Sequence, residues 1–173
     1  EDVQGLRIMA SRLGELIVAA SCSKNLGLYR ERTGVALFFG RDTQSAAATQ
    51  SHGLGAARRV YSMPPAHGAL LAGRVLSDPE LRSSWERELE HVCGRMISLR
   101  RQLSEKLSAK TDQDFSFIAN EKGMFSFLGL SVEQAKSLRQ THGLYMLDSS
   151  RVNVAALNAD NMDKVVAAVA SAL

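Results

Sequence analysis

One polar segment of the chain carries side chains that could do chemistry together. It is SCSKNLGLYRERTG, Ser21 to Gly34, and it begins at the last residue of the apolar run LIVAAS. Serine hydroxyls, glycines, a lysine and arginines in one turn suit the binding of an anion. At a strand end the amine of Lys24 can be desolvated, and nearby cations disfavour its ammonium form, so it could attack a carbonyl group. Arg32 stays charged and can bind a phosphate by two parallel hydrogen bonds.

The same residues also have an ordinary structural interpretation. Most single lysines are solvated surface groups, because lysine is almost never fully buried. The residue types alone therefore leave two interpretations open, an anion site with a reactive amine and a polar surface loop.

The elements before and after this segment are those of an α/β layer. We expect a helix at the start of the chain, a buried strand over Leu16 to Ser21 and a second strand over Gly34 to Gly40. An alanine-rich helix should follow from Asp42 to about Val60, end at the break MPPAHG, and resume through LLAGRVL. The first helix is predicted from apolar residues at three-to-four residue spacing: Val3, Leu6, Met9, Ala10 and Leu13.

A long helix of about 30 residues is the clearest element. Ser77 and Glu80 match a capping box at its start. Its apolar stripe comprises Leu81, Trp85, Leu89, Val92, Met96, Leu99, Leu103 and Leu107.

A small α+β unit is expected after the long helix. Phe115 to Ala119 and Met124 to Leu128 alternate like two half-buried strands around a turn at Lys122-Gly123. Ser131 and Gln134 should cap a helix that ends near Gly143. We further expect short strands at YML and VNVAAL, and a closing helix that starts at Asn158 and buries Met162, Val165, Val166 and Val169. The predicted domains are residues 1–73 and 74–173.

Composition excludes several classes of protein. The formal charge is +3, from 21 basic and 18 acidic residues without a basic cluster, so we expect no nucleic-acid partner. Two isolated cysteines and four single histidines give no metal-binding spacing. No apolar run reaches the roughly 20 residues of a membrane span, and the first residues do not resemble a secretory signal. We expect a cytoplasmic protein, and, because the sequence starts without methionine inside a helical pattern, a piece of a longer one.

The motifs together resemble one family. SCSKNLGLYRERTG resembles the cofactor-lysine segment of class I aminotransferases, the group of the aspartate and aromatic amino acid enzymes. ARRVYSMPPAHGA, DFSFIANEKGMFSFLGLS and SSRVNVAAL resemble three further motifs of this group, in the same order along the chain. The resemblance implies the C-terminal part of the large pyridoxal-phosphate-binding domain, then the long helix and a small α+β domain.

The resemblance also implies a role for individual residues. Lys24 matches the lysine that carries pyridoxal phosphate covalently and moves the proton at the substrate α-carbon. Arg32, with the hydroxyls of Ser21 and Ser23, matches the site for the cofactor phosphate. Arg151 matches the arginine that binds the substrate α-carboxylate, although a lone arginine is otherwise a surface ion-pair partner.

Two further substrate contacts are implied. Arg58 matches the arginine that receives a dicarboxylate side chain across a homodimer interface, an assignment that could slip to Arg59. Phe125 matches an aromatic wall of the substrate pocket, although at strand spacing it could equally be core. The chain departs from the family pattern at Cys22, Leu26 and Met63; Met63 removes a polar group and puts strict dicarboxylate preference in doubt.

The implied function is an aminotransferase that moves an amino group between an aromatic or dicarboxylic L-amino acid and 2-oxoglutarate, as a homodimer with shared active sites. A pyridoxal-phosphate-dependent lyase or decarboxylase of the same fold, and a non-catalytic dimerisation fragment, remain as alternatives. The acid that pairs with the pyridinium nitrogen and the residue stacked on the cofactor ring would belong to a preceding half. We therefore expect the chain alone to be inactive.

Overall fold

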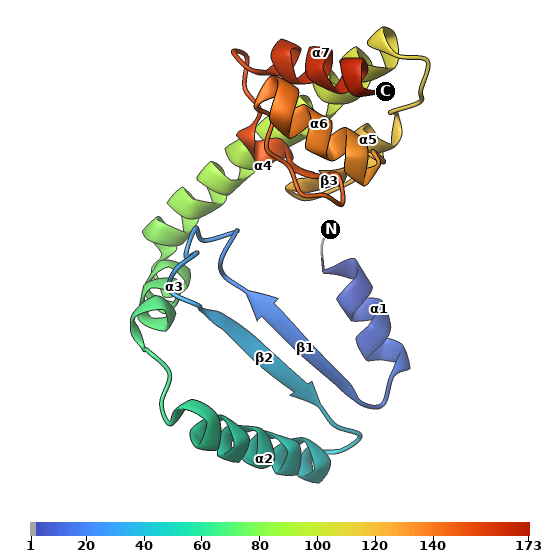
Figure 1. Ribbon diagram of the computed structural model, residues 1–173. Coiled ribbons are helices and arrows are strands. Elements are labelled where there is room, and N and C mark those ends of the chain that lie inside the picture. Colours follow the sequence, from blue (N-terminus) through green and yellow to red (C-terminus); the bar gives the residue numbers. More distant parts are fainter. Residues whose placement is uncertain (1–2) are drawn as a thin grey trace. The chain divides into compact units, whose positions relative to one another are not determined.

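The computed structural model describes residues 3–173 and divides into two compact units, Glu1–Glu86 and Arg87–Leu173. The ribbon in Figure 1 shows the elements of each unit. The division lies inside the long helix, whereas the predicted boundary at residues 73 and 74 precedes that helix. The helix belongs to both units because Trp85, near its start, donates a hydrogen bond from Nε1 to the carbonyl of Asn25 in the first unit, at 2.7 Å.

The first unit is built around an antiparallel hairpin. Strands β1 (Leu16–Ser21) and β2 (Gly34–Phe39) pair from Leu16↔Phe39 to Ser21↔Gly34. Both predicted strands are confirmed. The unit also contains helices α1 (Gln4–Arg12), α2 (Thr43–Tyr61), α3 (His67–Ser77) and the first turns of α4 (Pro79–Lys110).

The expected burial of β1 is wrong. Ile17 is 69% exposed and Val35 on β2 is 52% exposed. The reason is that, in the described chain, no third strand pairs with the hairpin. Helix α2 packs on β2. There, Gly53 of α2 approaches the ring of Phe38 so closely that an added Cβ would lie 3.3 Å from its Cζ.

Helix starts follow local capping chemistry. The carboxylate of Asp42 caps α2 by accepting from the backbone N–H of Ser45 at 2.7 Å. The capping box predicted at Ser77 and Glu80 is wrong, because Ser77 is still the last residue of α3. Asp78 performs the capping instead: its Oδ1 accepts from the N–H groups of Glu80 and Leu81.

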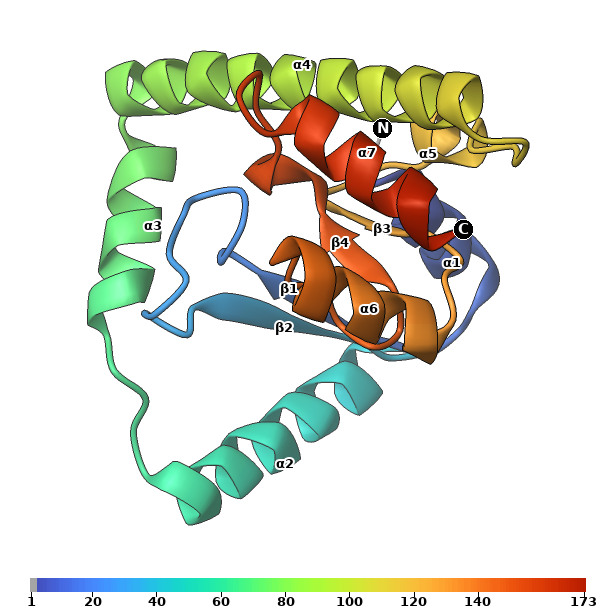
Figure 2. The same cartoon turned by 45° about the horizontal axis from the view of Figure 1, so that its top comes forward.

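The second unit packs a small α+β layer against the last turns of α4. Its elements are α5 (Phe117–Asn120), β3 (Phe125–Phe127), α6 (Val132–His142), β4 (Arg151–Asn153), the 3₁₀ turn η1 (Val154–Ala156) and α7 (Met162–Ala172). Figure 2 shows α6 and α7 side by side. The helix α4 has the predicted length, but only the second half of its stripe is buried; its four apolar core residues are Met96, Leu99, Leu103 and Leu107.

The strand predicted at Phe115 to Ala119 is wrong. The carboxylate of Asp114 accepts from the N–H of Ser116 at 2.8 Å, and the N–H of Ile118 bonds back to Phe115. These local bonds turn the chain into the short helix α5. Strand β3 is confirmed, but it pairs with β4 in antiparallel register, Phe125↔Asn153 and Phe127↔Arg151.

The last part of the chain is predicted more accurately for helices than for strands. The capping box of Ser131 and Gln134 is confirmed, and α6 ends at Gly143 in the left-handed region with φ of 62°. No strand forms at YML, and VNVAAL divides between β4 and η1. Asn158 caps a turn before α7, which begins at Met162. Among residues 3–173, no helix is long and apolar enough to cross a membrane.

Candidate functional site

The first group of candidate residues lies at one end of the hairpin. We call residues 22–33, which connect β1 to β2, the lysine loop. The loop is closed at its base, where the last strand pair is Ser21↔Gly34 and the N–H of Cys22 donates to the carbonyl of Thr33 at 3.0 Å. The fold therefore places Ser23, Lys24 and Arg32 in one closed loop, with Ser21 at its base as the last residue of β1.

Two serine hydroxyls stand together at the start of this loop. Ser21 Oγ lies 3.0 Å from Ser23 Oγ, and it also accepts from the backbone N–H of Ser23 at 3.1 Å. Ser23 is only 7% exposed. The pair is thus fixed by the backbone and presents two hydroxyl groups beside the lysine.

The lysine and the arginine both contact Tyr29. The Nζ of Lys24 lies 4.6 Å from the centre of the Tyr29 ring, a cation–π distance. Nη1 of Arg32 donates to the carbonyl oxygen of Tyr29 at 2.9 Å. Both side chains are exposed in the described chain, so their charged groups remain accessible to an added anion.

The donor set of the loop fits a phosphorylated aldehyde. A guanidinium and two hydroxyls are the groups that bind phosphate oxygens in proteins. A lysine amine is the group that adds to an aldehyde carbon. Pyridoxal phosphate combines both functions, and the residues present fit it.

Arg58 and Arg59 lie in the last turn of α2, and both are exposed. A Cβ added to Gly55 would lie 3.7 Å from Nη1 of Arg59, so this side chain runs back along its own helix. This leaves Arg58 as the better candidate for a contact with another molecule.

The second group lies in the second unit. Phe125 on β3 and Arg151 on β4 are diagonal neighbours across the ribbon, and the guanidinium carbon of Arg151 lies 4.8 Å from the ring centre of Phe125. Both line a pocket of about 480 Å³ whose other walls are mainly apolar, including Leu128, Leu144 and Met146. A charged fork beside an aromatic ring in such a pocket suits a carboxylate with an apolar group attached.

The backbone before Arg151 is held in an unusual conformation. Ser150 has φ of 61°, in the left-handed region that non-glycine residues rarely adopt. It is buried at 2% exposure, its Oγ accepts from the N–H of Gly129, and its carbonyl accepts from the N–H of Leu128. These bonds fix where β4 begins and hence where Arg151 stands.

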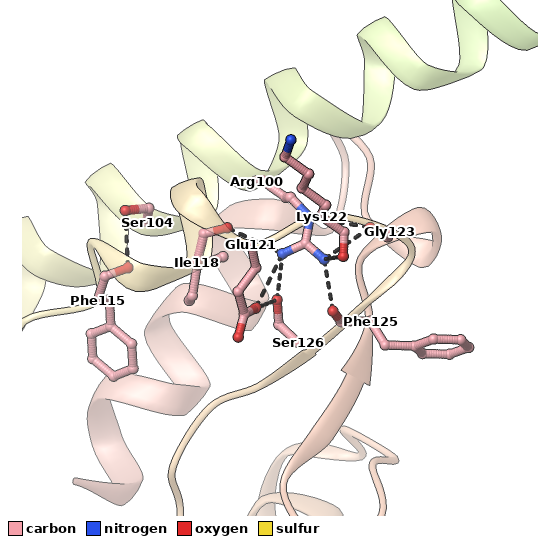
Figure 3. Close-up of polar contacts among 9 residues, drawn as sticks. All are labelled: Arg100, Ser104, Phe115, Ile118, Glu121, Lys122, Gly123, Phe125 and Ser126. Atoms are coloured by element: carbon pink, nitrogen blue, oxygen red, sulfur yellow. Dashed lines mark hydrogen bonds and ion pairs between the residues drawn. The ribbon is translucent and has the colours of Figure 1, made fainter. Parts of the chain in front are cut away.

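A buried arginine organises the strand that carries Phe125 (Figure 3). Arg100 on α4 is 3% exposed, and its guanidinium donates to Gly123 and Phe125 carbonyls at 2.8 Å and 2.7 Å. It also donates to Ser126 Oγ at 2.6 Å and forms an ion pair with Glu121 at 3.3 Å. We call Arg100, Glu121, Ser126 and the carbonyls of Ile118, Gly123 and Phe125 the Arg100 cluster.

Sequence reasoning missed Arg100, which it counted only among the 21 basic residues of the chain. One signal was present: Arg100 lies four residues after Met96 and three before Leu103, and so on the buried face of α4. Its partners lie 18 to 26 residues away and are not visible in any local motif.

Within residues 3–173, no group of three or more His, Cys, Asp or Glu side chains is placed to hold a metal ion. Cys22 and Cys93 are free thiols.

These residues and this fold define a class of protein. The model of the family described as aminotransferase class I and II matches residues 1–169, and the chain belongs to this family.

Individual members of the family are similar over nearly the whole chain. The aromatic-amino-acid aminotransferase of Paracoccus denitrificans is 45% identical over 168 residues, which cover 96% of this chain and 42% of the relative. The aspartate aminotransferase of Escherichia coli K12 is 42% identical over 174 residues, 100% of this chain and 44% of the relative. The chain therefore spans about two fifths of the length of these relatives.

Solved structures show the same likeness. A structure of the Burkholderia pseudomallei aromatic-amino-acid aminotransferase, described as covalently bound to pyridoxal phosphate, matches with a TM-score of 0.92 and 38% identity. The match covers 99% of this chain and 43% of that one. It confirms the predicted class of fold, part of the α/β fold of pyridoxal-phosphate-dependent aminotransferases.

Proposed function

We propose that this chain provides the cofactor lysine and the carboxylate-binding arginine of an aminotransferase that acts on aromatic or dicarboxylic L-amino acids, with 2-oxoglutarate as the acceptor. The observation that carries the proposal is the lysine loop, in which Lys24, Arg32 and the buried hydroxyl of Ser23 are held together by one closed hairpin. The relatives named as aromatic and aspartate aminotransferases support both substrate classes. Because the chain spans two fifths of their length, the activity is proposed for the whole protein.

The cofactor is expected at the lysine loop. Lys24 would hold pyridoxal phosphate through its amine, and Arg32, Ser21 and Ser23 would bind its phosphate. When bound, pyridoxal phosphate supplies an electron-withdrawing ring that stabilises negative charge at the substrate α-carbon. The Lys24 amine is the group proposed to take the proton from that carbon and to return it at the end of the transfer.

The substrate is expected at the second unit. The guanidinium of Arg151 can bind the α-carboxylate by two parallel hydrogen bonds, which fix the orientation of the amino acid around its α-carbon. The ring of Phe125, stacked on Arg151, offers an apolar surface to an aromatic substrate side chain. Phe125 also limits the directions in which the guanidinium can turn.

We further propose a homodimer. Arg58, exposed in the last turn of α2, is available to a carboxylate held by a second protomer. Such a residue would favour a dicarboxylic substrate. The cytoplasmic location expected from the sequence stays a prediction.

Covalent labelling tests the lysine site directly. The chain is incubated with pyridoxal phosphate, treated with borohydride to fix the attachment, and digested for peptide mass analysis. Lys24 is one of six lysines, and the other five lie beyond residue 105, so they serve as internal controls for surface reactivity. We expect the label to concentrate on Lys24 and to fall to the level of the other lysines in Arg32→Met. A label spread evenly over all six would show that the loop of this chain alone does not hold the cofactor.

Substrate comparison tests the reaction itself. In the whole protein, rates with aspartate and with phenylalanine are measured with 2-oxoglutarate, together with the products. We expect oxaloacetate or phenylpyruvate and glutamate. Release of carbon dioxide without a new amino acid would identify a decarboxylase and overturn the proposal.

A further inference from the structure

The N-terminus of α3 lies directly against the lysine loop. Gly68, in the first turn of α3, is buried. A Cβ added there would lie 1.9 Å from Oγ1 of Thr33 and 2.7 Å from Cβ of Glu31. Both distances are far below van der Waals contact, so no side chain fits unless the loop moves. Gly73 in the same helix has open space around it, with no atom within 4 Å of an added Cβ.

The two residues that Gly68 touches flank Arg32. Arg32 itself has φ of 51°, in the left-handed region. A non-glycine residue there costs free energy and persists only where its surroundings hold it. Before Arg32, Glu31 Oε2 lies 2.9 Å from Nδ1 of His67 at the start of α3. After Arg32, Thr33 faces Gly68, and its Oγ1 donates within the loop to the carbonyl of Glu31 at 3.2 Å. The start of α3 thus contacts the loop immediately before and immediately after the strained residue.

The lysine end of the loop is held separately. Trp85 Nε1 donates to the carbonyl of Asn25, the residue after Lys24, at 2.7 Å. Gly68 therefore acts on the arginine end of the loop, and a change at Gly68 should alter phosphate binding more than it alters the reactivity of the lysine.

We infer that Gly68 is a positioning residue for the phosphate-binding arginine: the bare backbone of α3 at this point, helped by the His67–Glu31 pair, holds Arg32 in its left-handed conformation. The inference rests on the proposed role of Arg32 in phosphate binding. Gly68 itself touches no ligand.

The experiment compares two aldehydes on the full 173-residue chain. Pyridoxal phosphate carries the phosphate that pyridoxal lacks, and borohydride labelling with each is measured at Lys24 and, as an internal reference, at the other five lysines. The ratio of the two labels at Lys24, divided by the same ratio at the other five lysines, reports the phosphate contribution at the loop. The division removes the lower aldehyde content of pyridoxal, whose free 5′-hydroxyl closes on its aldehyde. Unfolding would also abolish this contribution, so circular dichroism first verifies the fold of each variant. We expect a wild-type ratio of about ten or more, since hydrogen bonds to charged groups contribute about 1.5–3 kcal/mol. Gly68→Ala should bring the ratio close to one.

The matched control is Gly73→Ala, in the same helix, which should keep the wild-type ratio. Thr33→Ala removes the nearest atom, so Gly68→Ala combined with Thr33→Ala should recover part of the ratio. Because Gly68→Ala could prevent folding, His67→Ala provides a milder variant. Its ratio should fall about twofold, because the His67–Glu31 contact is largely exposed and contributes little free energy.

The outcomes separate the two proposals. A wild-type ratio near one would overturn the proposed phosphate site and this inference with it. A high wild-type ratio that both Gly68→Ala and His67→Ala preserve would leave the proposed function standing and overturn the positioning role.

Discussion

Arg100 is a charged side chain that the fold can bury because its donors are satisfied. The guanidinium bonds to carbonyl groups of the segment 118–125, to Ser126 and to Glu121. Removing the arginine leaves these acceptors, and the Glu121 carboxylate, without the partner that replaced water. A buried charge network is strongly destabilised by the loss of one member.

We predict that Arg100→Met lowers the free energy of unfolding of residues 87–173 by about 3–5 kcal/mol. Arg101→Met is the control, because Arg101 is exposed on the same helix turn and should change stability by no more than about 0.5 kcal/mol. Urea denaturation followed by circular dichroism measures both. Equal effects of the two substitutions would show that the Arg100 cluster contributes little to stability.

Single residues could be predicted from the sequence where their partners are close in the chain. Ser21, Ser23, Lys24 and Arg32 stand within twelve residues, and the strands on either side close them into one loop. Arg100 could not be found in this way, because its hydrogen-bond partners depend on the packing of α4 against a segment 18 residues further on.

At the scale of elements, the start of α2 depends on one carboxylate. Hydrogen bonds, first from the backbone N–H of Ser45, hold the pKa of Asp42 below its ordinary value. A lowered pKa in the folded chain means that the cap stabilises α2 fully above the ordinary aspartate value of about 3.9. The stabilisation is lost as the pH falls through the lowered value.

An NMR titration of the Ser45 amide proton checks this prediction. Its chemical shift should change with a midpoint below about 3.9, as the bond to Asp42 is lost. Asp42→Asn is the control, since an asparagine oxygen can still cap the helix but does not titrate. A midpoint at or above the ordinary value would contradict the proposed hydrogen bond.

The capping box of α6 offers a second test at this scale. Ser131 Oγ accepts from the N–H of Gln134 at 3.2 Å, and the Gln134 side chain accepts from the N–H of Ser131 at 2.8 Å. Ser131→Ala should lower the free energy of unfolding by about 1 kcal/mol, because it removes one half of this reciprocal pair. Ser137→Ala, an exposed change within the same helix, should be neutral or slightly stabilising. If both variants unfold at the same urea concentration, the capping box does not stabilise the chain.

Helices and strands were predicted best where a pattern and a stop signal agree. The runs LIVAAS and GVALFFG are bounded by polar residues or contain a bounding glycine. Strand β1 matches the first run residue for residue, and β2 ends one residue before Gly40. FSFIA fits both a strand and a helical turn, and the cap from Asp114 decides for the turn. The choice between strand and turn depends on the direction of the Asp114 side chain, which the spacing of apolar residues does not indicate.

At the scale of the whole molecule, the apolar core is unevenly distributed. The buried hydrophobic cluster of the described residues lies entirely between Met96 and Val169. In the first unit, apolar side chains such as Ile17, Val35 and Leu54 are more than half exposed. The sequence could not show this. The composition of an apolar strand indicates that its side chains must pack against another element, but not whether that element belongs to the same chain.

The uneven core gives a prediction about local stability. Amide hydrogens of the second half of α4, α6 and α7 should exchange slowly, near the rate set by global unfolding, since their side chains pack in the core. Amides of the β1–β2 hairpin should exchange faster by orders of magnitude, because few buried contacts oppose their opening.

Leu107 is fully buried and is the residue at which to perturb the core. Leu107→Ala should lower the free energy of unfolding by about 2–5 kcal/mol and accelerate exchange throughout residues 87–173. Leu54→Ala, at a side chain that is 66% exposed, is the control and should leave both units unchanged. Hydrogen exchange measured by mass spectrometry distinguishes the β1–β2 hairpin from the helices of the second unit. If hairpin amides exchanged as slowly as those of α7, the first unit would have a stability of its own that its exposed side chains do not explain.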